Sequence, residues 1–137
     1  MKVRDIMTTK VESLKPTTVL RTAARKMSEL NIGSMPVVDD NGKLLGIITD
    51  RDISVYAIAM GRNPQDTEVQ KIMSKDVATC LADQELSDAA SIMEQRHVRR
   101  LAVMDNDELS GFLSVDDLAQ VSSELAGAVL EAATPIH

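Results

Sequence analysis

Two short motifs in the sequence place a carboxylate three residues after a hydroxyl. Thr49 precedes Asp52 and Ser114 precedes Asp117, in each case after a glycine and two apolar residues. A hydroxyl that caps a helix accepts a hydrogen bond from an amide of the first turn, and an acid three residues later returns one to the cap. Both pairs therefore predict helix starts. A carboxylate in such a turn at the mouth of a cleft can also accept hydrogen bonds from both hydroxyls of a ribose, while the hydroxyl of Thr49 or Ser114 stays within reach of the sugar or phosphate. The two interpretations are compatible.

Arginines near these motifs are candidates for contacts with phosphate. Arg99 and Arg100 adjoin where a strand is expected, and a guanidinium group matches phosphate oxygens bidentately. Successive strand residues point to opposite faces, so at most one of the two faces a given cleft. Arg51, inside the first motif, is a further phosphate candidate. The alternative for Arg99 and Arg100 is an ordinary solvated basic pair.

The residue patterns of common enzymes are missing from this chain. The sequence has no Cys/His spacing of a zinc site and no GxxxxGK[ST] phosphate loop, and its histidines are His97 and His137 alone. A Ser/His/Asp set finds no support either. We therefore predict that the protein is not an enzyme and has no catalytic residues, no metal site and no catalytic cofactor.

Composition and charge exclude further classes of protein. The 137 residues are 44% hydrophobic and 26% charged, which is ordinary for a globular protein. A net charge of -6 and only two aromatic residues, Tyr56 and Phe112, argue against a nucleic-acid binder. No apolar run approaches the roughly 20 residues of a membrane span, so no membrane contact is expected. The single cysteine, Cys80, and a start without a signal-peptide pattern predict an intracellular, cytoplasmic protein.

The chain is two copies of one unit. Residues 3–39 overlay residues 69–105 at a shift of 66, and the shift becomes 65 after a turn that is one residue shorter in the second copy. Each copy is predicted to form a strand, a helix, two strands in a hairpin and a second helix. The amphipathic spacing of the first helix appears in both copies, at Leu20, Ala23, Ala24 and Met27 and at Leu86, Ala89, Ala90 and Met93.

These patterns set the expected boundaries. In the first copy, Asn31 suits the end of the first helix and Asn41-Gly42 suits the hairpin turn. The last helix is expected to run from Val115 through Val129 and to stop before Pro135. The predicted organisation is repeat 1 at residues 1–60, a connecting loop at 61–68, repeat 2 at 69–121 and a helical tail at 122–137.

The ordered set of motifs resembles a tandem pair of CBS (cystathionine β-synthase) domains over residues 1–121. The matching stretches are GIITDRDI at 46–53 and GFLSVDDL at 111–118, VRDIMT at 3–8 and VQKIMS at 69–74, and MPVVD at 35–39 and RRLAVMD at 99–105. The resemblance implies an α/β (α+β) fold of two βαββα repeats related by a pseudo-two-fold axis, with clefts between them that hold adenosyl ligands. The second copy departs from the pattern at Ala102, where the first copy has Pro36.

The resemblance also implies roles for the candidate residues. It makes Asp52 and Asp117 ribose ligands, and it places basic side chains such as Arg99 or Arg100 against phosphates. The aligned residues of the first copy are uncharged, so a phosphate-rich ligand should prefer the second cleft. The adenine-pocket candidates are Thr79, Met35, Pro36 and Leu101.

We therefore predict a regulatory or sensor module that binds AMP, ADP, ATP, NAD or S-adenosylmethionine. The alternative is a ligand-free dimerisation or interaction scaffold, which the same acid in both copies disfavours. A regulated partner protein is expected but not identified. The chain is also predicted to form a homodimer through helical residues that keep apolar surface, namely Ile53, Ala57, Met60, Leu118, Val121 and Leu125.

Overall fold

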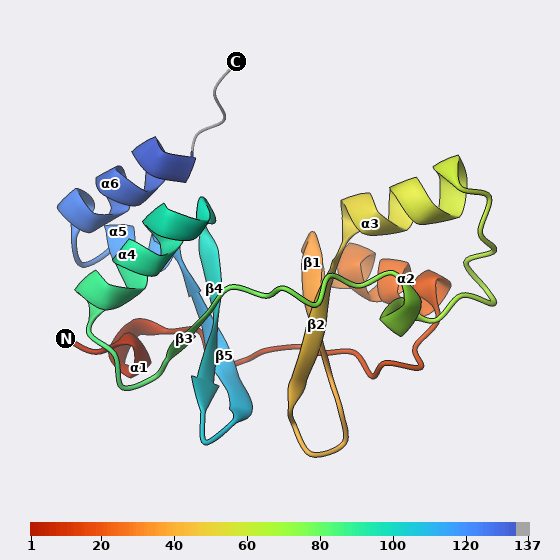
Figure 1. Cartoon of the computed structure of the whole chain (residues 1–137), viewed down its shortest axis with the longest axis horizontal. Helices are drawn as coiled ribbons and strands as arrows, with labels where there is room; N and C mark the ends of the chain where they lie inside the picture. The colour runs from red at the N-terminus through yellow and green to blue at the C-terminus, as the bar shows by residue number, and fades with distance from the viewer. Residues whose placement is uncertain (134–137) are drawn as a thin grey trace. The chain divides into compact units, whose positions relative to one another are not determined.

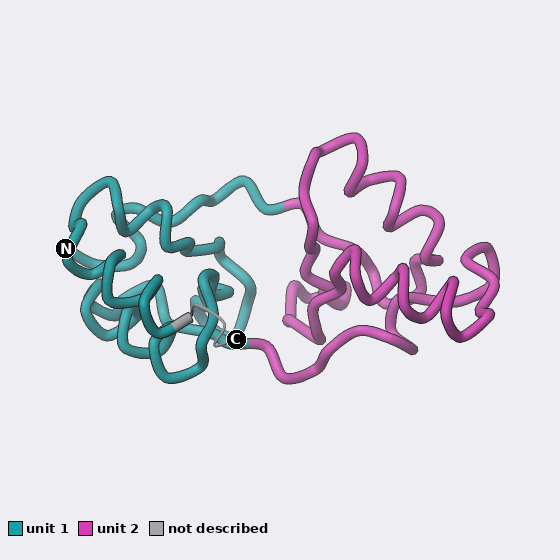
Figure 2. The backbone as a smooth tube through the Cα atoms, turned by 90° about the horizontal axis from the view of Figure 1, so that it is seen from above, with its two compact units in different colours: residues 1–11, 78–137 teal, residues 12–77 magenta. Residues whose placement is uncertain are grey.

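The computed structural model describes residues 1–133 and contains one small β-sheet in each of two units (Figure 1). Unit 2 consists of residues 12–77, and unit 1 combines residues 1–11 with the chain from residue 78 onward (Figure 2). The combination of helices with two small sheets confirms the predicted mixed fold class. Among the described residues, no helix has the length and apolar character that crossing a membrane requires.

The sheet of unit 2 is an antiparallel hairpin of β1 (Ser34–Val38) and β2 (Leu44–Thr49). Asp39 organises the turn between the strands, because its Oδ1 accepts a hydrogen bond from the Asn41 amide at 2.9 Å. Gly42 has a φ of 82°, a conformation that glycine adopts without a steric penalty. The hairpin predicted around Asn41-Gly42 is therefore confirmed.

The sheet of unit 1 has three strands in the order β3-β4-β5, with β3 parallel to β4 and β4 antiparallel to β5. The strands are β3 (Thr79–Leu81), β4 (Arg100–Asp105) and β5 (Glu108–Ser114). Cys80 pairs with Val103 across β3 and β4. In unit 2 the matching residues, Leu14 and Val37, form a single parallel bridge. The first copy thus keeps the pairing of its initial strand while the strand itself is reduced to one residue.

Helices pack against both sheets. Unit 2 contains α2 (Leu20–Leu30), α3 (Asp50–Ser54), the π-helix η1 (Val55–Ala59) and the short 3-10 helix η2 (Val69–Lys71). Unit 1 contains α1 (Val3–Ile6), α4 (Leu86–Arg96), α5 (Val115–Ala119) and α6 (Ser123–Ala133). Helices α2 and α4 end alike, because Asn31 and His97 both take a left-handed φ of 55°. The helix stop predicted at Asn31 is confirmed.

Alternate strand residues build the two cores. In unit 2 the helix-facing strand residues are fully buried: Met35, Val37 and Ile48 pack with Leu14, Leu20, Ala23 and Met27. In unit 1 the corresponding cluster contains Leu101, Val103 and Leu113 with Leu86, Ala89, Ala90 and Met93. The apolar helix spacing seen in the sequence therefore marks the core side of α4 along its whole length. On α2 it does so except at Ala24, which is exposed.

The segments at the start of the two repeats exchange units. Residues 2–8 belong to unit 1, although the rest of the first repeat forms unit 2, and residues 68–74 belong to unit 2. Their bridges are related by the repeat shift: Lys2 with Glu85 matches Glu68 with Val19, and Thr8 with Phe112 matches Ser74 with Ile47. Each sheet is thus completed by a segment from the other copy. The repeat boundaries expected from the sequence stay a prediction, and the compact units divide the chain differently.

The tail is two helices rather than one. Helix α5 ends at Ala119, and the Oγ of Ser122 accepts a hydrogen bond from the Leu125 amide at 3.2 Å as a new helix begins. The prediction of a continuous helix from Val115 through Val129 is therefore wrong, because a serine cap restarts the helix in a new direction. Its predicted stop before Pro135 lies outside the described residues.

Helix α6 returns across α4 and α5 (Figure 1). Leu118 is consequently 0% exposed in the core of unit 1, and Leu125 packs against the same core. The prediction that Leu118 remains available for a dimer contact is wrong, because α6 covers it within the chain, whereas for the partly buried Leu125 on α6 it stays a prediction. Val121, beside the break, remains exposed.

Candidate functional site

Both hydroxyl–carboxylate pairs cap helices as the sequence predicts. The Oγ1 of Thr49 accepts a hydrogen bond from the Asp52 amide, and Asp52 Oδ2 accepts one from the Thr49 amide, each at 3.0 Å. Ser114 and Asp117 repeat this arrangement at 3.1 and 2.8 Å. Each cap starts the helix that follows the last strand of its sheet, so strand and helix together fix the position of the acid.

Each cap occupies only one oxygen of its carboxylate. Asp52 and Asp117 are half-buried, and across residues 1–133 the Oδ1 atom of neither acid forms a hydrogen bond or ion pair. Because the cap already holds the side chain, binding a ligand at Oδ1 costs little further rotamer entropy. The arrangement can accept a hydrogen bond from a polar ligand without losing the cap.

The second pair shares one face of its sheet with an arginine. Arg100 lies opposite Ser114, and Ala102 lies between Thr79 on β3 and Phe112 on β5. Paired strand residues point to the same face and successive ones alternate, so all five side chains are on a single face. The opposite face carries the core residues Leu101, Val103 and Leu113.

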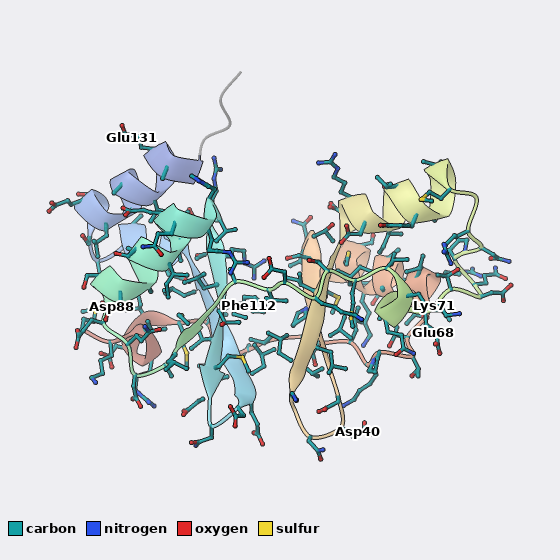
Figure 3. All side chains as sticks on the ribbon, in the orientation of Figure 1. Asp40, Glu68, Lys71, Asp88, Phe112 and Glu131 are labelled. Atoms are coloured by element: carbon teal, nitrogen blue, oxygen red, sulfur yellow. The ribbon has the colours of Figure 1, made fainter. Side chains whose placement is uncertain are left out.

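Arg100 is held on this face by an aromatic ring. The central carbon of its guanidinium lies 4.7 Å from the ring centroid of Phe112, which is a cation–π distance. Figure 3 shows Phe112 on the side of β5 that faces away from α4 and α6. A stacked guanidinium keeps its N–H donors around its edge, which is the geometry that phosphate recognition uses.

The other two phosphate candidates are placed differently. Arg99 is exposed and lies just before β4, where its carbonyl accepts the Val115 amide at 2.9 Å. Arg51 is exposed in the first turn of α3. Of the adjacent pair, it is therefore Arg100 that the structure brings onto the face of Ser114.

The matching face of unit 2 has a serine where unit 1 has Arg100. Ser34 lies opposite Thr49, and Pro36 lies opposite Ile47. Ser34 thus takes the position that Arg100 has in unit 1. The two sites share their capped acid and differ in the residue beside it.

The adenine-pocket candidates fall on both faces of the sheets. Thr79 is exposed on the face of Ser114, and Pro36 is on the face of Thr49. Met35 and Leu101 are 0% exposed and belong to the helix-facing cores. Adenine contact stays a prediction for all four residues, and Thr79 and Pro36 are the two that share a face with the capping hydroxyls.

Phe112 is the site residue that the sequence analysis did not single out. It lies two positions before Ser114, and period-two alternation along β5 puts both on one face. The signal was present in the sequence, because Ser114 had already been identified. Because Phe112 and Leu113 are both apolar, their polarity does not show which of them lies on the face of Ser114.

The remaining reactive groups lie away from this face or do not cluster. Burial raises the pKa of the Cys80 thiol to about 11, so the thiol stays protonated as part of the core. Within the described part of the chain, no group of three or more His, Cys, Asp or Glu side chains is arranged to hold a metal ion.

Comparison with known proteins gives consistent matches. The family model described as CBS domain matches residues 3–58 and 69–124. The CBS domain-containing protein YhcV of Bacillus subtilis is 39% identical over 130 residues, which cover 93% of this chain and 91% of that protein. The crystal structure of CBSX2 in complex with AMP has 26% identity and a TM-score of 0.76, covering 90% of this chain and 97% of the other. A CBS domain pair in complex with 5′-methylthioadenosine and S-adenosyl-L-methionine has 25% identity and a TM-score of 0.74, covering 88% and 98%.

Proposed function

Because this chain belongs to the CBS domain family, we propose that it is a regulatory module that binds an adenine nucleotide or related adenosyl ligand. Asp52 and Asp117 accept hydrogen bonds from the ribose in this proposal. The observation that carries it is the duplicated cap, which fixes each acid and leaves its Oδ1 for a ligand. The complexes of similar proteins with AMP and with S-adenosyl-L-methionine support the adenosyl class. The candidates are AMP, ADP, ATP, NAD and S-adenosylmethionine.

The two sites are proposed to differ in their preference for charge. Arg100 is on the face of Ser114 in unit 1, while Ser34 has the matching position in unit 2. A guanidinium group strengthens hydrogen bonds to phosphate, and a serine does so much less. A ligand that carries phosphates should therefore bind more tightly at Asp117 than at Asp52.

The proposal describes a binding protein rather than an enzyme. Its partners are the adenosyl ligand, a second copy of the chain and a regulated protein that the chain does not identify, and its proposed location is the cytoplasm. A scaffold without ligand is the second candidate function. It is favoured by apolar side chains that unit 2 exposes, including Ile58 and Met60.

Thermal unfolding with candidate ligands tests the binding proposal. A ligand that binds only the folded protein raises the free energy of unfolding by about 2.7 kcal/mol when its free concentration is one hundred times its Kd. Melts with AMP, ATP, NAD and S-adenosylmethionine should show a rise in melting temperature that GTP does not produce. The Asp52→Asn/Asp117→Asn double variant is the matched control and should show a clearly smaller rise. Unchanged melts with all adenosyl ligands would refute the proposal and favour the scaffold.

A further inference from the structure

Three neighbouring positions differ between the two sheet faces that carry the capping hydroxyls. In unit 1 these positions hold Arg100, Ala102 and Phe112, and in unit 2 they hold Ser34, Pro36 and Ile47. The strand pairing is the same in both units, because the first position lies opposite the capping hydroxyl and the other two lie opposite each other. The copies thus share one backbone frame and differ in the side chains that it presents beside the capped acid.

Ala102, where the second copy departs from the repeated pattern, affects the pairing of β3. Its amide donates a hydrogen bond at 3.1 Å to the carbonyl of Ala78, just before β3. A proline has no amide hydrogen, so Pro36 cannot make the matching bond. In unit 2 the initial strand is accordingly a single bridge, between Leu14 and Val37. The alanine therefore gives the unit 1 face a third strand.

Phe112 lies beside this alanine and below the arginine. Ala102 is its direct partner across β4 and β5, and Arg100 is its diagonal neighbour. The side chain of alanine is a single methyl group, which leaves space on this face for a large neighbour. The phenylalanine is 6% exposed, and its amide and carbonyl exchange hydrogen bonds with Thr8 at 3.0 and 2.8 Å. The ring is therefore a fixed support.

A fixed ring below an exposed arginine prepares that arginine for a ligand. Arg100 is exposed, and the central carbon of its guanidinium lies 4.7 Å from the centroid of the Phe112 ring. An exposed arginine loses side-chain entropy when a ligand orders it. Stacking restricts the side chain before the ligand arrives, so less entropy is lost on binding. Ile47, at the matching position of unit 2, has no ring.

We infer that Phe112 is a positioning residue for Arg100, and that Ala102 provides the space for their stacking. The phosphate preference of the unit 1 site is then set by three residues rather than by one charge. The inference rests on the proposed binding of an adenosyl ligand, and it names what makes one site select phosphates. An arginine introduced at Ser34 of unit 2 lacks this support, so the charge alone should confer only part of the preference.

Calorimetric titrations with ATP and with adenosine separate positioning from folding. Phe112→Ile should weaken ATP binding about three- to tenfold and change adenosine binding by less than about twofold, because only phosphates use the guanidinium. Phe112→Tyr keeps the ring and should retain the wild-type ratio of the two affinities. All chains in this comparison carry Asp52→Asn, so that the titration reports the unit 1 site. Circular dichroism melts show that each variant is folded.

The reverse experiment builds the same support in unit 2. In a chain that carries Arg100→Gln, Ser34→Arg adds the charge alone, whereas Ser34→Arg/Pro36→Ala/Ile47→Phe adds the charge with its ring and its space. The triple change should bind ATP about three- to tenfold more tightly than the single change, with equal affinity for adenosine. This experiment decides the inference if Phe112→Ile does not fold.

The outcomes separate this inference from the proposed function. An unchanged ratio of ATP to adenosine affinity in Phe112→Ile overturns the inference, and so do equal losses of both ligands, which indicate a structural role for the ring. Equal ATP affinity of the single and triple changes in unit 2 overturns it as well. In these cases adenosyl binding still stands. A wild-type chain that binds neither ATP nor adenosine instead refutes the proposed function for these ligands.

Discussion

Replacing Asp117 with asparagine separates the two tasks that the structure gives to its carboxylate. Oδ2 caps α5 by accepting the Ser114 amide at 2.8 Å, and Oδ1 is the proposed ribose acceptor. Asparagine has the same shape but only one acceptor oxygen. When that oxygen accepts the Ser114 amide, an uncharged NH₂ group takes the place of Oδ1 and faces the ligand. The substitution should preserve the helix start and weaken ligand binding.

The size of the binding loss follows from the change in hydrogen-bond type. A hydrogen bond to a charged group contributes about 1.5–3 kcal/mol and a neutral one about 0.5–1.5 kcal/mol. Replacing a charged hydrogen bond by a neutral one therefore costs about 1.4 kcal/mol of binding free energy per ribose hydroxyl. This weakens binding about tenfold for one hydroxyl and about a hundredfold for two. Calorimetric titration with AMP measures this directly. Asp52→Asn is the matched variant in unit 2, so each single variant should weaken one site and the double variant both.

The stability side of the experiment needs a variant that loses the cap. Ser114→Ala removes the oxygen that accepts the Asp117 amide at 3.1 Å, which should lower the free energy of unfolding by about 0.5–2 kcal/mol. Asp117→Asn loses only the favourable charge in the first helical turn, about 0.3–1 kcal/mol. Wild-type affinity for AMP in Asp117→Asn, combined with a lower melting temperature, would show that the acid is a cap and nothing more.

Four further predictions concern individual residues. Arg100→Gln should weaken ATP about tenfold or more and leave adenosine nearly unchanged, because only phosphates use the guanidinium; equal losses in calorimetric titrations would contradict this. Gly111→Ala should lower the free energy of unfolding by about 1–3 kcal/mol, since its Cβ would lie 2.5 Å from the carbonyl oxygen of Thr8. Gly127→Ala on α6, where a Cβ meets nothing within 4 Å, should instead raise it by up to about 1 kcal/mol in denaturant melts. With the pKa of Cys80 raised from 9.0 to about 11 by burial, the folded state keeps a proton that the unfolded chain releases, so stability should fall from about pH 9 to pH 11. Cys80→Ala should flatten that fall, and an identical pH slope would refute the assignment.

The repeated elements could be predicted from sequence because their patterns are local. The hydroxyl–carboxylate caps depend on residues three positions apart, and the helix stop at Asn31 depends on one residue that tolerates a left-handed backbone. The exchange of residues 2–8 and 68–74 is not local. Both segments have the same pattern of apolar residues, so each fits either sheet, and no periodicity in the sequence distinguishes the two pairings.

Environment explains the other differences between expectation and structure. Ala24 and Ala90 are the same residue at the same helical position, yet one is exposed and the other buried because only unit 1 has α6 above it. Arg99 and Arg100 are identical in type, and only strand register decides which of them shares a face with Ser114. Pattern analysis identifies the residue types that can do a task, and tertiary contacts choose among them.

Close approach of another backbone segment explains why each of the two motifs begins with a glycine. A Cβ at Gly46 would lie 2.7 Å from the carbonyl oxygen of Ser74, and one at Gly111 would lie 2.5 Å from that of Thr8. Both glycines therefore admit the backbone of the exchanged segment rather than a ligand. The hydroxyl and the acid that follow serve the helix start, and Oδ1 of the acid is left for the ligand. Each eight-residue motif thus contains the glycine that admits the exchanged segment, the residues that start the helix and the proposed ligand acceptor. A substitution of the glycine should disturb the site through the fold. A substitution of the acid should weaken ligand binding directly.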